Sequence, residues 1–219
     1  MCAAIHYDSD KISSKLNSNI ISAPSINADT RRNFDNINIA AGILGNSGDW
    51  ASGGSASINI LNNINTVNIT DNKIKTDNFN SNVHNDGNIV NVAGQGAWSG
   101  KVAFGAAFAL NNMNNSASSI INGSSFNSLS KPMAFNTNVL NDTASTAVAA
   151  SGSVSQEGSS GNVSLAMNFG QNSTQAIIDK SKSNSNVEIL NAKNVDVSAT
   201  DKNRKFSLAG TTVILCLFR

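Results

Sequence analysis

The sequence predicts an all-β protein, a parallel β-helix (β-solenoid) with Asn- and Gly-rich turns. Apolar residues alternate with small or polar ones along short segments, which is typical of strands. Similar segments recur at long intervals, which is typical of solenoids and repeat arrays. Asn, Ser, Thr and Gly dominate the polar positions and favour turns and caps over helix interiors, and no segment shows sustained helical periodicity.

Short alternating segments, most of them separated by turn residues, predict the strands in chain order. The segments are Ile37 to Ile43, Ala56 to Ile60, Val67 to Ile69, Ile89 to Val92, Val102 to Leu110, Thr146 to Ala150, Val163 to Phe169, Val187 to Ile189 and Val195 to Ala199.

The segment "KVAFGAAFALNN" (101–112) has one apolar side and one nearly bare side. Val102, Phe104, Phe108 and Leu110 alternate with Ala and Gly. Because successive strand residues point to opposite faces, we expect the Val/Phe/Leu face to be buried. The Ala/Gly face is expected to lie outside or under a close neighbouring layer. The face containing Val163, Leu165, Met167 and Phe169 in a later copy is expected to behave in the same way.

Three copies of one pattern are visible. Residues 48–69 resemble 96–120, with Trp50 matching Trp98 and the run from Leu61 matching the run from Leu110 at an offset of about 48 to 49. A third copy, 158–178, follows the second at an offset of about 57. Met167, Asn168, Asn172 and Ile178 of this copy match Leu110, Asn111, Asn115 and Ile121.

The larger offset predicts an insertion, and the stretch "SFNSLSKPMAFNT" with Pro132 is the expected loop. A second element, 25–42, resembles 195–210, with Phe34 matching Phe206 before an Ala-Gly ending. The expected order within a unit is strand, polar link, Gly/Ala/Ser stretch, strand, Asn-rich turn and strand.

This organisation divides the chain into three parts. Residues 1–18 are expected to be irregular or a partial N-terminal rung, and residues 19–210 the β-helical array. Its units cover about 25–80, 81–140 and 141–200, and the next begins at 201–210. Residues 211–219 are expected to be an off-pattern tail.

A solenoid explains both the repeat and the Asn content. Each strand pairs with its equivalent in the next rung, so stability accumulates by stacking of neighbours. Asn tolerates left-handed corners, and stacked Asn side chains can pair amide to amide. Asn111 and Asn168 recur in register and are the expected ladder members, while codon bias is the alternative origin of most other Asn residues. Disorder, a β-sandwich and a Greek-key barrel are the structural alternatives.

Composition excludes several function classes. The formal net charge is +1 with 13% charged residues, and the four arginines (31, 32, 204 and 219) are scattered, so nucleic acid is not an expected partner. The longest apolar run, "VILCLF", is far short of a membrane-spanning helix. Cys2 and Cys216 have no metal-ligand spacing and are expected to be unpaired thiols.

No residue pattern indicates a catalytic, cofactor or metal site. His6 and His84 are isolated, and the only glutamates are Glu157 and Glu188. Gly-rich "SGGSAS" and "GSSGNVS" lack the features of phosphate loops. Paired carboxylates for sugar cleavage would have to come from scattered residues such as Asp142, Asp179 and Asp196. We therefore expect no enzyme activity and no cofactor, with a polysaccharide-active β-helix enzyme as the alternative.

The segments "FALNNMNNSASSII", "LAMNFGQNSTQAII" and "NVDVSATDKNRKFSLAG" resemble the repeat region of large bacterial surface adhesins, the filamentous-haemagglutinin-like and leukotoxin-type filamentous adhesins. The resemblance covers about residues 19–210. It implies a right-handed β-helix shaft, exported to the cell surface, that displays loops to protein or glycan receptors on host cells or other bacteria. The stalk of a toxin-delivery exoprotein is a further alternative.

The sequence departs from that family at its ends. "MCAAIHYDSDKISS" does not have the pattern of a signal peptide, and "TTVILCLFR" leaves the repeat pattern after "FSLAG". We therefore expect a fragment of a longer adhesin, with edge-to-edge self-association possible at its end rungs.

Overall fold

The computed structural model describes residues 1–180 and 185–215 and shows an all-β chain with parallel strands in three sheets. Sheet A contains β1 (Cys2–Asn17), β4 (Trp50–Thr70), β7 (Val102–Asn122), β10 (Ser159–Phe169) and β11 (Asn172–Asp179). Sheet B contains β2 (Ile20–Ser22), β5 (Lys73–Lys75), β8 (Ser125–Asn127) and β12 (Glu188–Leu190). Sheet C contains β3 (Ser25–Asn46), β6 (Asn78–Ser99), β9 (Met133–Ser155) and β13 (Ala192–Leu215).

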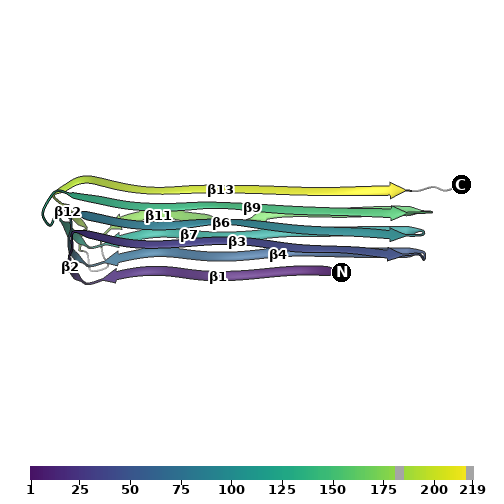
Figure 1. Cartoon of the computed structure of the whole chain (residues 1–219), viewed down its shortest axis with the longest axis horizontal. Coiled ribbons are helices and arrows are strands. Elements are labelled where there is room, and N and C mark those ends of the chain that lie inside the picture. The colour runs from purple at the N-terminus through teal and green to yellow at the C-terminus, as the bar shows by residue number, and fades with distance from the viewer. Residues whose placement is uncertain (181–184, 216–219) are drawn as a thin grey trace.

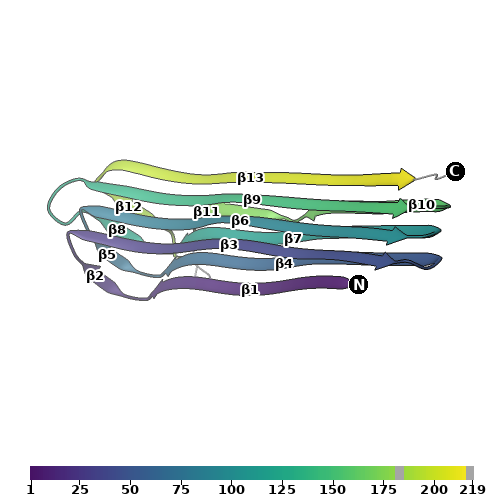
Figure 2. The same cartoon turned by 45° about the vertical axis from the view of Figure 1, so that its right-hand side comes forward.

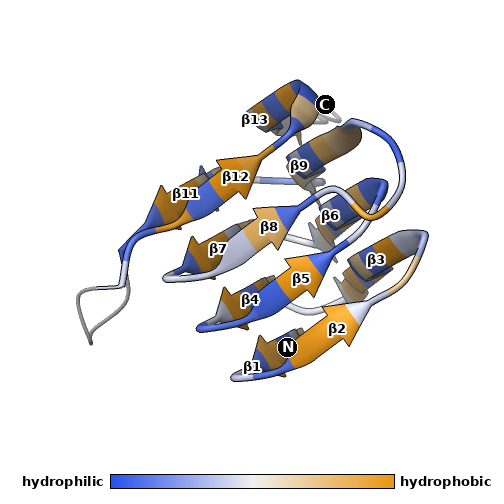
Figure 3. Cartoon of the chain, turned by 90° about the vertical axis from the view of Figure 1, so that its left-hand side faces the viewer, coloured by the Kyte–Doolittle hydropathy of each residue, from blue (hydrophilic) through white to orange (hydrophobic). Residues whose placement is uncertain are grey.

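Each rung runs along sheet A, turns through the short sheet B and returns along sheet C (Figures 1 and 2). The chain then crosses back to sheet A one rung higher. Followed from β1 through β2 to β3 in Figure 3, the coil ascends with a right-handed turn. The fold is therefore a right-handed parallel β-solenoid, as expected, and its four rungs are unusually wide because the long strands have about twenty residues.

The rungs begin at different residues from the expected units. They start with β1, β4, β7 and β10, about half a rung away from 25, 81 and 141. Residues 1–18 contain a strand of 16 residues, β1, and β13 continues through residues 211–215 of the expected tail. The remainder of that tail, including Cys216, lies outside the described residues. Pairing with β4 and β9 provides the hydrogen bonds that keep both segments extended.

The strands are longer than the sequence predicts. Every expected strand segment lies within one of them except at Val187, which precedes β12. The Asn-rich stretch 111–115, expected to be a turn, lies in the middle of β7. Its local preference for turns is overridden because stacked neighbours pair with both its backbone and its amide side chains.

The register confirms the match between the second and third copies. Asn168 pairs with Asn111, and the other three expected pairs are also observed: Met167 with Leu110, Asn172 with Asn115 and Ile178 with Ile121. The match between the first and second copies is wrong by three residues, because Leu61 pairs with Met113 rather than Leu110. Trp50 accordingly pairs with Val102, not Trp98. The reason is that the two copies of the motif Leu-Asn-Asn, at 61–63 and 110–112, occupy different register positions in the paired strands β4 and β7.

The second recurring element is displaced in the same way. Phe34 and Phe206 both lie in sheet C, but Phe206 occupies the column of Ile37 rather than that of Phe34. The expected insertion is confirmed. The offset between paired residues grows from 52 at Lys73 and Ser125 to 56 at Asn78 and Ala134, so the extra residues form the loop 128–132.

Asp77 anchors this inserted loop. Its Oδ1 accepts hydrogen bonds from the backbone N–H groups of Leu129, Ser130 and Lys131 at 3.1, 2.8 and 3.1 Å, and its Oδ2 accepts one from the Ser130 hydroxyl. The Ser130 hydroxyl and these N–H groups lower the pKa of Asp77 to about 2. The Asp77 carboxylate, in the preceding rung, therefore supplies the acceptor for three backbone N–H groups of the inserted loop.

The corners between sheets A and B are stacked left-handed residues. Ser18, Asp71 and Gly123 follow the paired ends of β1, β4 and β7 and have φ of 54°, 54° and 55°. Asn191, with φ of 55°, precedes β13. Asn thus occupies one of these four corners, and most Asn residues have a different role from the corner role expected.

The main apolar core lies next to sheet B, where three sheets enclose a wide space. Phe79, Phe126 and Phe135 pack there with ring centroids 4.7 to 5.0 Å apart. Aliphatic residues of sheets A and C surround them, including Val67 and Ile121. Burial of such side chains contributes about 1.5–3 kcal/mol each, so this end of every rung stabilises the stack.

Candidate functional site

The first half of β7 has its large apolar residues on the outer face. Ala103, Ala107 and Ala109 are 0 to 3% exposed, whereas Phe104 is 40% exposed. The expectation that the Val102, Phe104, Phe108 and Leu110 face is buried is therefore wrong. The same reversal occurs in β10, where Val163 is 55% and Leu165 46% exposed.

The narrow space between the sheets explains this reversal. Away from sheet B, sheets A and C face each other directly. A Cβ added to Gly105 of β7 would lie 3.1 Å from the Gly152 carbonyl oxygen of β9. Asn91 of β6 reaches across to the Ser57 and Leu110 carbonyls of sheet A, each at 2.7 Å. A gap bridged by one short amide side chain has no room for Phe or Leu, so only small residues fit inside.

Large apolar side chains therefore cover the outside of this half of the solenoid, on both long sheets. We call these two surfaces the apolar bands. The band on sheet A contains Ile5, Tyr7, Trp50, Ile58, Ile60, Phe104, Phe108, Leu110, Val163, Leu165, Met167 and Phe169. The band on sheet C contains Ile37, Ile39, Ile43, Val90, Val92, Trp98, Val148, Val154, Phe206, Leu208 and Ile214.

Each band ends about halfway along the strands. In β1, the outward residues change from Ile5 and Tyr7 to Ser9 and Lys11, and in β3 they change from Asp35 to Ile37. The apolar stripes on the ribbons of Figure 3 show the alternation that produces the two faces. Near sheet B, each long strand therefore points its large apolar side chains into the interior, which is the conventional arrangement. At its other end it points them outward, and we call this arrangement inverted.

Buried amides hold the inverted half together. Asn111 donates to Asn168 Oδ1 of the next rung at 2.9 Å and to the Thr146 carbonyl of the opposite sheet at 2.8 Å. Asn38, one rung below Asn91, likewise donates to two sheet A carbonyls, those of Ala4 and Ile58, each at 3.0 Å. The expected Asn ladder is confirmed, and it lies inside the solenoid and also connects the two sheets.

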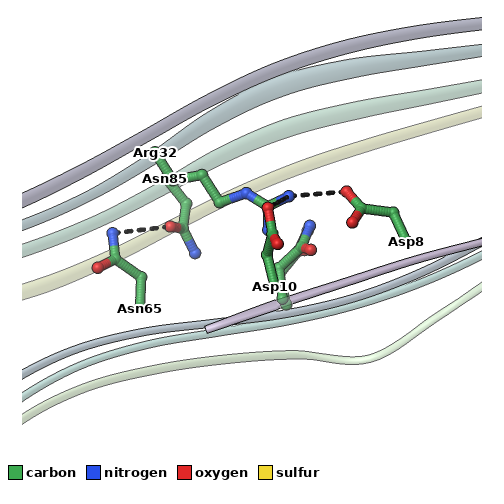
Figure 4. A network of polar contacts seen from close by, with 7 residues as sticks. Asp8, Asp10, Arg32, Asn65 and Asn85 are labelled. Carbon is green, nitrogen blue, oxygen red and sulfur yellow. Dashed lines mark hydrogen bonds and ion pairs between the residues drawn. The ribbon is translucent and has the colours of Figure 1, made fainter. Parts of the chain in front are cut away.

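A polar network marks the middle of the lowest rung (Figure 4). The Arg32 guanidinium is 5% exposed and its Nη2 lies 2.9 Å from Asp8 Oδ2 and 3.0 Å from Asp10 Oδ2. In the next rung, Asn65 donates to Asn85 Oδ1 at 3.0 Å, again linking sheet A to sheet C. The network lies where the strands change from conventional to inverted packing.

The scattered carboxylates of the sequence remain scattered. Asp142 and Asp196 lie at separate positions on the outer face of sheet C, and Asp142 accepts a hydrogen bond from Arg204 at 2.6 Å. Asp179 ends β11 in sheet A. His6 faces the interior from β1, and His84 faces outward from β6. Glu157 lies in the turn before β10, and Glu188 begins β12.

Within the described ranges, no group of three or more His, Cys, Asp or Glu residues is arranged to hold a metal ion. The segments "SGGSAS" and "GSSGNVS" contribute to β4 and to the start of β10. Cys2 is an unpaired thiol on β1.

An open depression of about 790 Å³ interrupts the outer face of sheet A at the break between β10 and β11. The break occurs at Gly170, where φ is 143° and a Cβ would lie 1.9 Å from the Met113 carbonyl oxygen. The lining residues carry no ionisable side chain; they include Asn114, Gln171 and the ring of Phe169. The depression thus adds amide groups at the edge of an apolar band.

Sequence reasoning missed the apolar bands because it assumed that the larger residues of an alternating segment face the core. The available signal was the Ala, Gly, Ser and Asn composition of the opposite face, which fits a narrow interior.

The part of the chain that the structure describes contains no helix of the length and apolar character required to cross a membrane. No protein-family model, curated protein or solved structure matches the chain.

Proposed function

We propose that this chain is a non-catalytic shaft segment of a secreted bacterial surface adhesin or exoprotein, and that the apolar bands are its attachment surfaces. The observation that carries the proposal is the exposure of large apolar side chains on both faces of a rigid, flat solenoid. Extensive exposed apolar patches on a folded protein are characteristic of interaction sites.

The rigidity of the bands supports this role. Their backbones are paired on both sides within the middle rungs, and buried Ala and Asn residues hold the two sheets together beneath them. A preorganised apolar surface loses little conformational entropy when it binds. It therefore suits attachment to a partner surface without a deep pocket.

The proposed partners are receptors on host cells or other bacteria, and the proposed location is the cell surface. Among protein and glycan receptors, the bands favour proteins, because aromatic and aliphatic side chains supply apolar contact area but few hydrogen bonds. The resemblance to filamentous-haemagglutinin-like adhesins agrees with this proposal.

Binding of the fluorescently labelled full chain to epithelial cells and to bacteria, measured by flow cytometry, tests the proposal. The variant Tyr7→Ser/Phe104→Ser/Leu165→Ser removes three exposed band side chains that are 65%, 40% and 46% exposed. We expect its apparent affinity to fall at least about tenfold, since exposed aromatic anchors typically dominate such interfaces.

Ile20→Ser is the matched control, because Ile20 is 85% exposed on β2 of sheet B and lies outside both bands. It should bind like the unaltered chain. Binding to neither cell type, or equal binding by the triple variant, would contradict the proposal.

A further inference from the structure

The open depression at the break between β10 and β11 differs in composition from the apolar bands. It extends over three rungs on the outer face of sheet A, and its lining residues come from β4, β7 and the two sides of the break. Strands that pair with one another lie side by side in a sheet, so a neighbouring rung does not cover this outer face. The depression is therefore a recess in the side of the shaft.

A column of outward amide side chains crosses the depression. Asn62 pairs with Asn114 in the register of β4 and β7, and Gln171 lies beside Asn114 in the next rung. Asn114 donates from Nδ2 to Asn62 Oδ1 at 3.0 Å, and its own Oδ1 accepts a hydrogen bond from the Gln171 backbone N–H at 3.1 Å. Within residues 1–180 and 185–215, the Asn62 Nδ2 group and the Gln171 side-chain amide have no hydrogen-bond partner. The column thus retains donors and an acceptor for an outside molecule.

Apolar side chains lie on both sides of this amide column. Phe169, which precedes the break, is 52% exposed, and Ile64, two residues after Asn62, is 44% exposed. Ser116 and Ser173 belong to the column of Ile64 and add hydroxyl groups to the lining. Of the described residues that line the depression, none has an ionisable side chain. The depression therefore combines apolar contact area with uncharged hydrogen-bonding groups.

Contacts from both sheets fix the backbone at the break. The Asn115 N–H of β7 donates to the Gln171 carbonyl at 3.0 Å, and Lys205 of sheet C donates from Nζ to the Gly170 carbonyl at 2.9 Å. Gly170 itself has a φ of 143°, which L side chains rarely adopt. The depression is thus preorganised, and a ligand that enters it pays little for ordering the backbone.

This lining fits an uncharged sugar better than other ligand classes. A pyranose ring has C–H groups on its faces, which pack on an aromatic ring, and hydroxyl groups at its rim, which donate and accept hydrogen bonds as Asn and Gln side chains do. A charged ligand would lose hydration without meeting an opposite charge, and a wholly apolar ligand would leave the amides unpaired. A peptide strand binds by pairing with a free strand edge, whereas β7 beneath the depression is already paired on both sides.

We propose that the depression is a binding site for an uncharged oligosaccharide, in which a sugar ring packs on Phe169 and sugar hydroxyl groups bond with the amides of Asn62 and Gln171. Neighbouring strands are about 4.8 Å apart, so the amide column extends over about 10 Å, enough for a short oligosaccharide. The inference goes beyond the proposed attachment to proteins, because it gives the shaft a second class of ligand at a separate site.

Isothermal titration calorimetry of the full chain with two uncharged probes, cellotetraose and chitotetraose, tests the proposal. Only chitotetraose has acetamido groups, so the pair distinguishes two kinds of neutral sugar. We expect saturable binding of at least one probe. Phe169→Ala and Gln171→Ala should each weaken that binding at least about fivefold, because one removes the stacking ring and the other the free amide. Phe169→Trp, which retains an aromatic face, should preserve it.

Leu165→Ala and Gln175→Ala are the matched controls. They alter an exposed apolar residue of β10 and an exposed amide of β11, and neither residue lines the depression. Both variants should bind the probe like the unaltered chain. Far-ultraviolet circular dichroism of all five variants should be unchanged, because every substitution is at an exposed position.

Three results would overturn the proposal. One is the absence of saturable binding of both probes at concentrations up to about 10 mM. Another is equal probe affinity in Phe169→Ala, Gln171→Ala and the unaltered chain, which would place any sugar site elsewhere. The third is tighter binding of an anionic heparin tetrasaccharide than of either neutral probe. Attachment to protein receptors through the apolar bands would remain possible in each case, because these titrations contain no protein partner.

Discussion

The inverted half of the solenoid makes an unusual prediction for two alanines three residues apart. Ala109 faces inward and is fully buried, and Ala106 faces outward on the same strand. Replacing each in turn by Leu adds the same three carbon atoms. Only Ala109→Leu should destabilise the fold.

The surroundings of the two alanines determine the magnitude. Ala109 packs in a cluster with Ala93, Ala107, Ala147 and Ala149 between two sheets, and overpacking of such a site typically costs about 1–3 kcal/mol. The outward column of Ala106 contains Gly54 and Val163, which leave space for a larger side chain. Ala106→Leu should change the free energy of unfolding by no more than about 0.5 kcal/mol.

Urea unfolding followed by far-ultraviolet circular dichroism measures both variants. With a slope of about 2 kcal/mol per M, a loss of about 2 kcal/mol lowers the midpoint by about 1 M. Phe104→Ser extends the comparison, since Phe104 is 40% exposed and its loss should cost less than about 1 kcal/mol. A neutral Ala109→Leu with a cost of about 3–5 kcal/mol for Phe104→Ser, the value for a buried Phe, would refute the assigned orientation.

Three further comparisons use the same chain. Asn91→Ala should lower the free energy of unfolding by about 1–3 kcal/mol, because it removes three cross-sheet hydrogen bonds, two donated to carbonyls and one accepted from the Ser57 hydroxyl. Asn88→Ala, which removes one exposed bond, should be nearly neutral; equal urea midpoints would contradict the bridging role. Gly105→Ala should cost about 1–3 kcal/mol by pushing against the Asn162 side chain of β10 and the Gly152 carbonyl of β9. Gly54→Ala, which meets nothing within 4 Å, should be neutral or stabilising by up to about 1 kcal/mol in thermal unfolding; the reverse order would show that the gap is wider. The folded pKa of Asp77, about 2, is below its unfolded value of about 3.9, so its stabilisation of the inserted loop is complete above that value and is lost as the pH falls toward 2. Hydrogen-exchange protection of the loop amides should decrease over this window in the unaltered chain but not in Asp77→Asn, which lacks the titrating carboxyl; an equal decrease in both would contradict the assignment.

The fold class and the register between the second and third copies were predictable because stacking repeats similar side chains at fixed offsets. Asn111 and Asn168 are in register in the sequence and hydrogen-bonded in the structure. The loop at 128–132 was also predictable, because an insertion changes the offset between copies. These features depend on comparison within the chain and not on the shape of the interior.

The orientation of the strands was not predictable from alternation alone. Alternation divides Val102 to Leu110 into two faces, but the distance between sheets A and C determines which one fits inside. That distance depends on tertiary contacts such as Asn91 with Leu110 and Gly105 near Gly152. Because the apolar bands follow from this distance, the candidate site was not visible at the sequence level.

Local propensity also misplaced the strand ends. Asn and Gly in isolation favour turns, yet in this chain the buried Asn side chains are paired with carbonyls and with one another across rungs and sheets. The pairing between rungs therefore overrides local preference over long stretches of each strand. Turns are confined to the links between strands, and at two of these corners, Asp71 and Gly123, φ is positive.

A cysteine-accessibility scan along β7 tests the central claim most directly. In the full chain with Cys2→Ser and Cys216→Ser, single cysteines replace residues 103, 104, 106, 107, 108 and 109, and the rate of reaction with a charged thiol reagent is measured for each. The inverted solenoid predicts fast labelling at 104, 106 and 108 and slow labelling at 103, 107 and 109. Fast labelling at the odd positions with protection of the even ones, or no alternation, would contradict it.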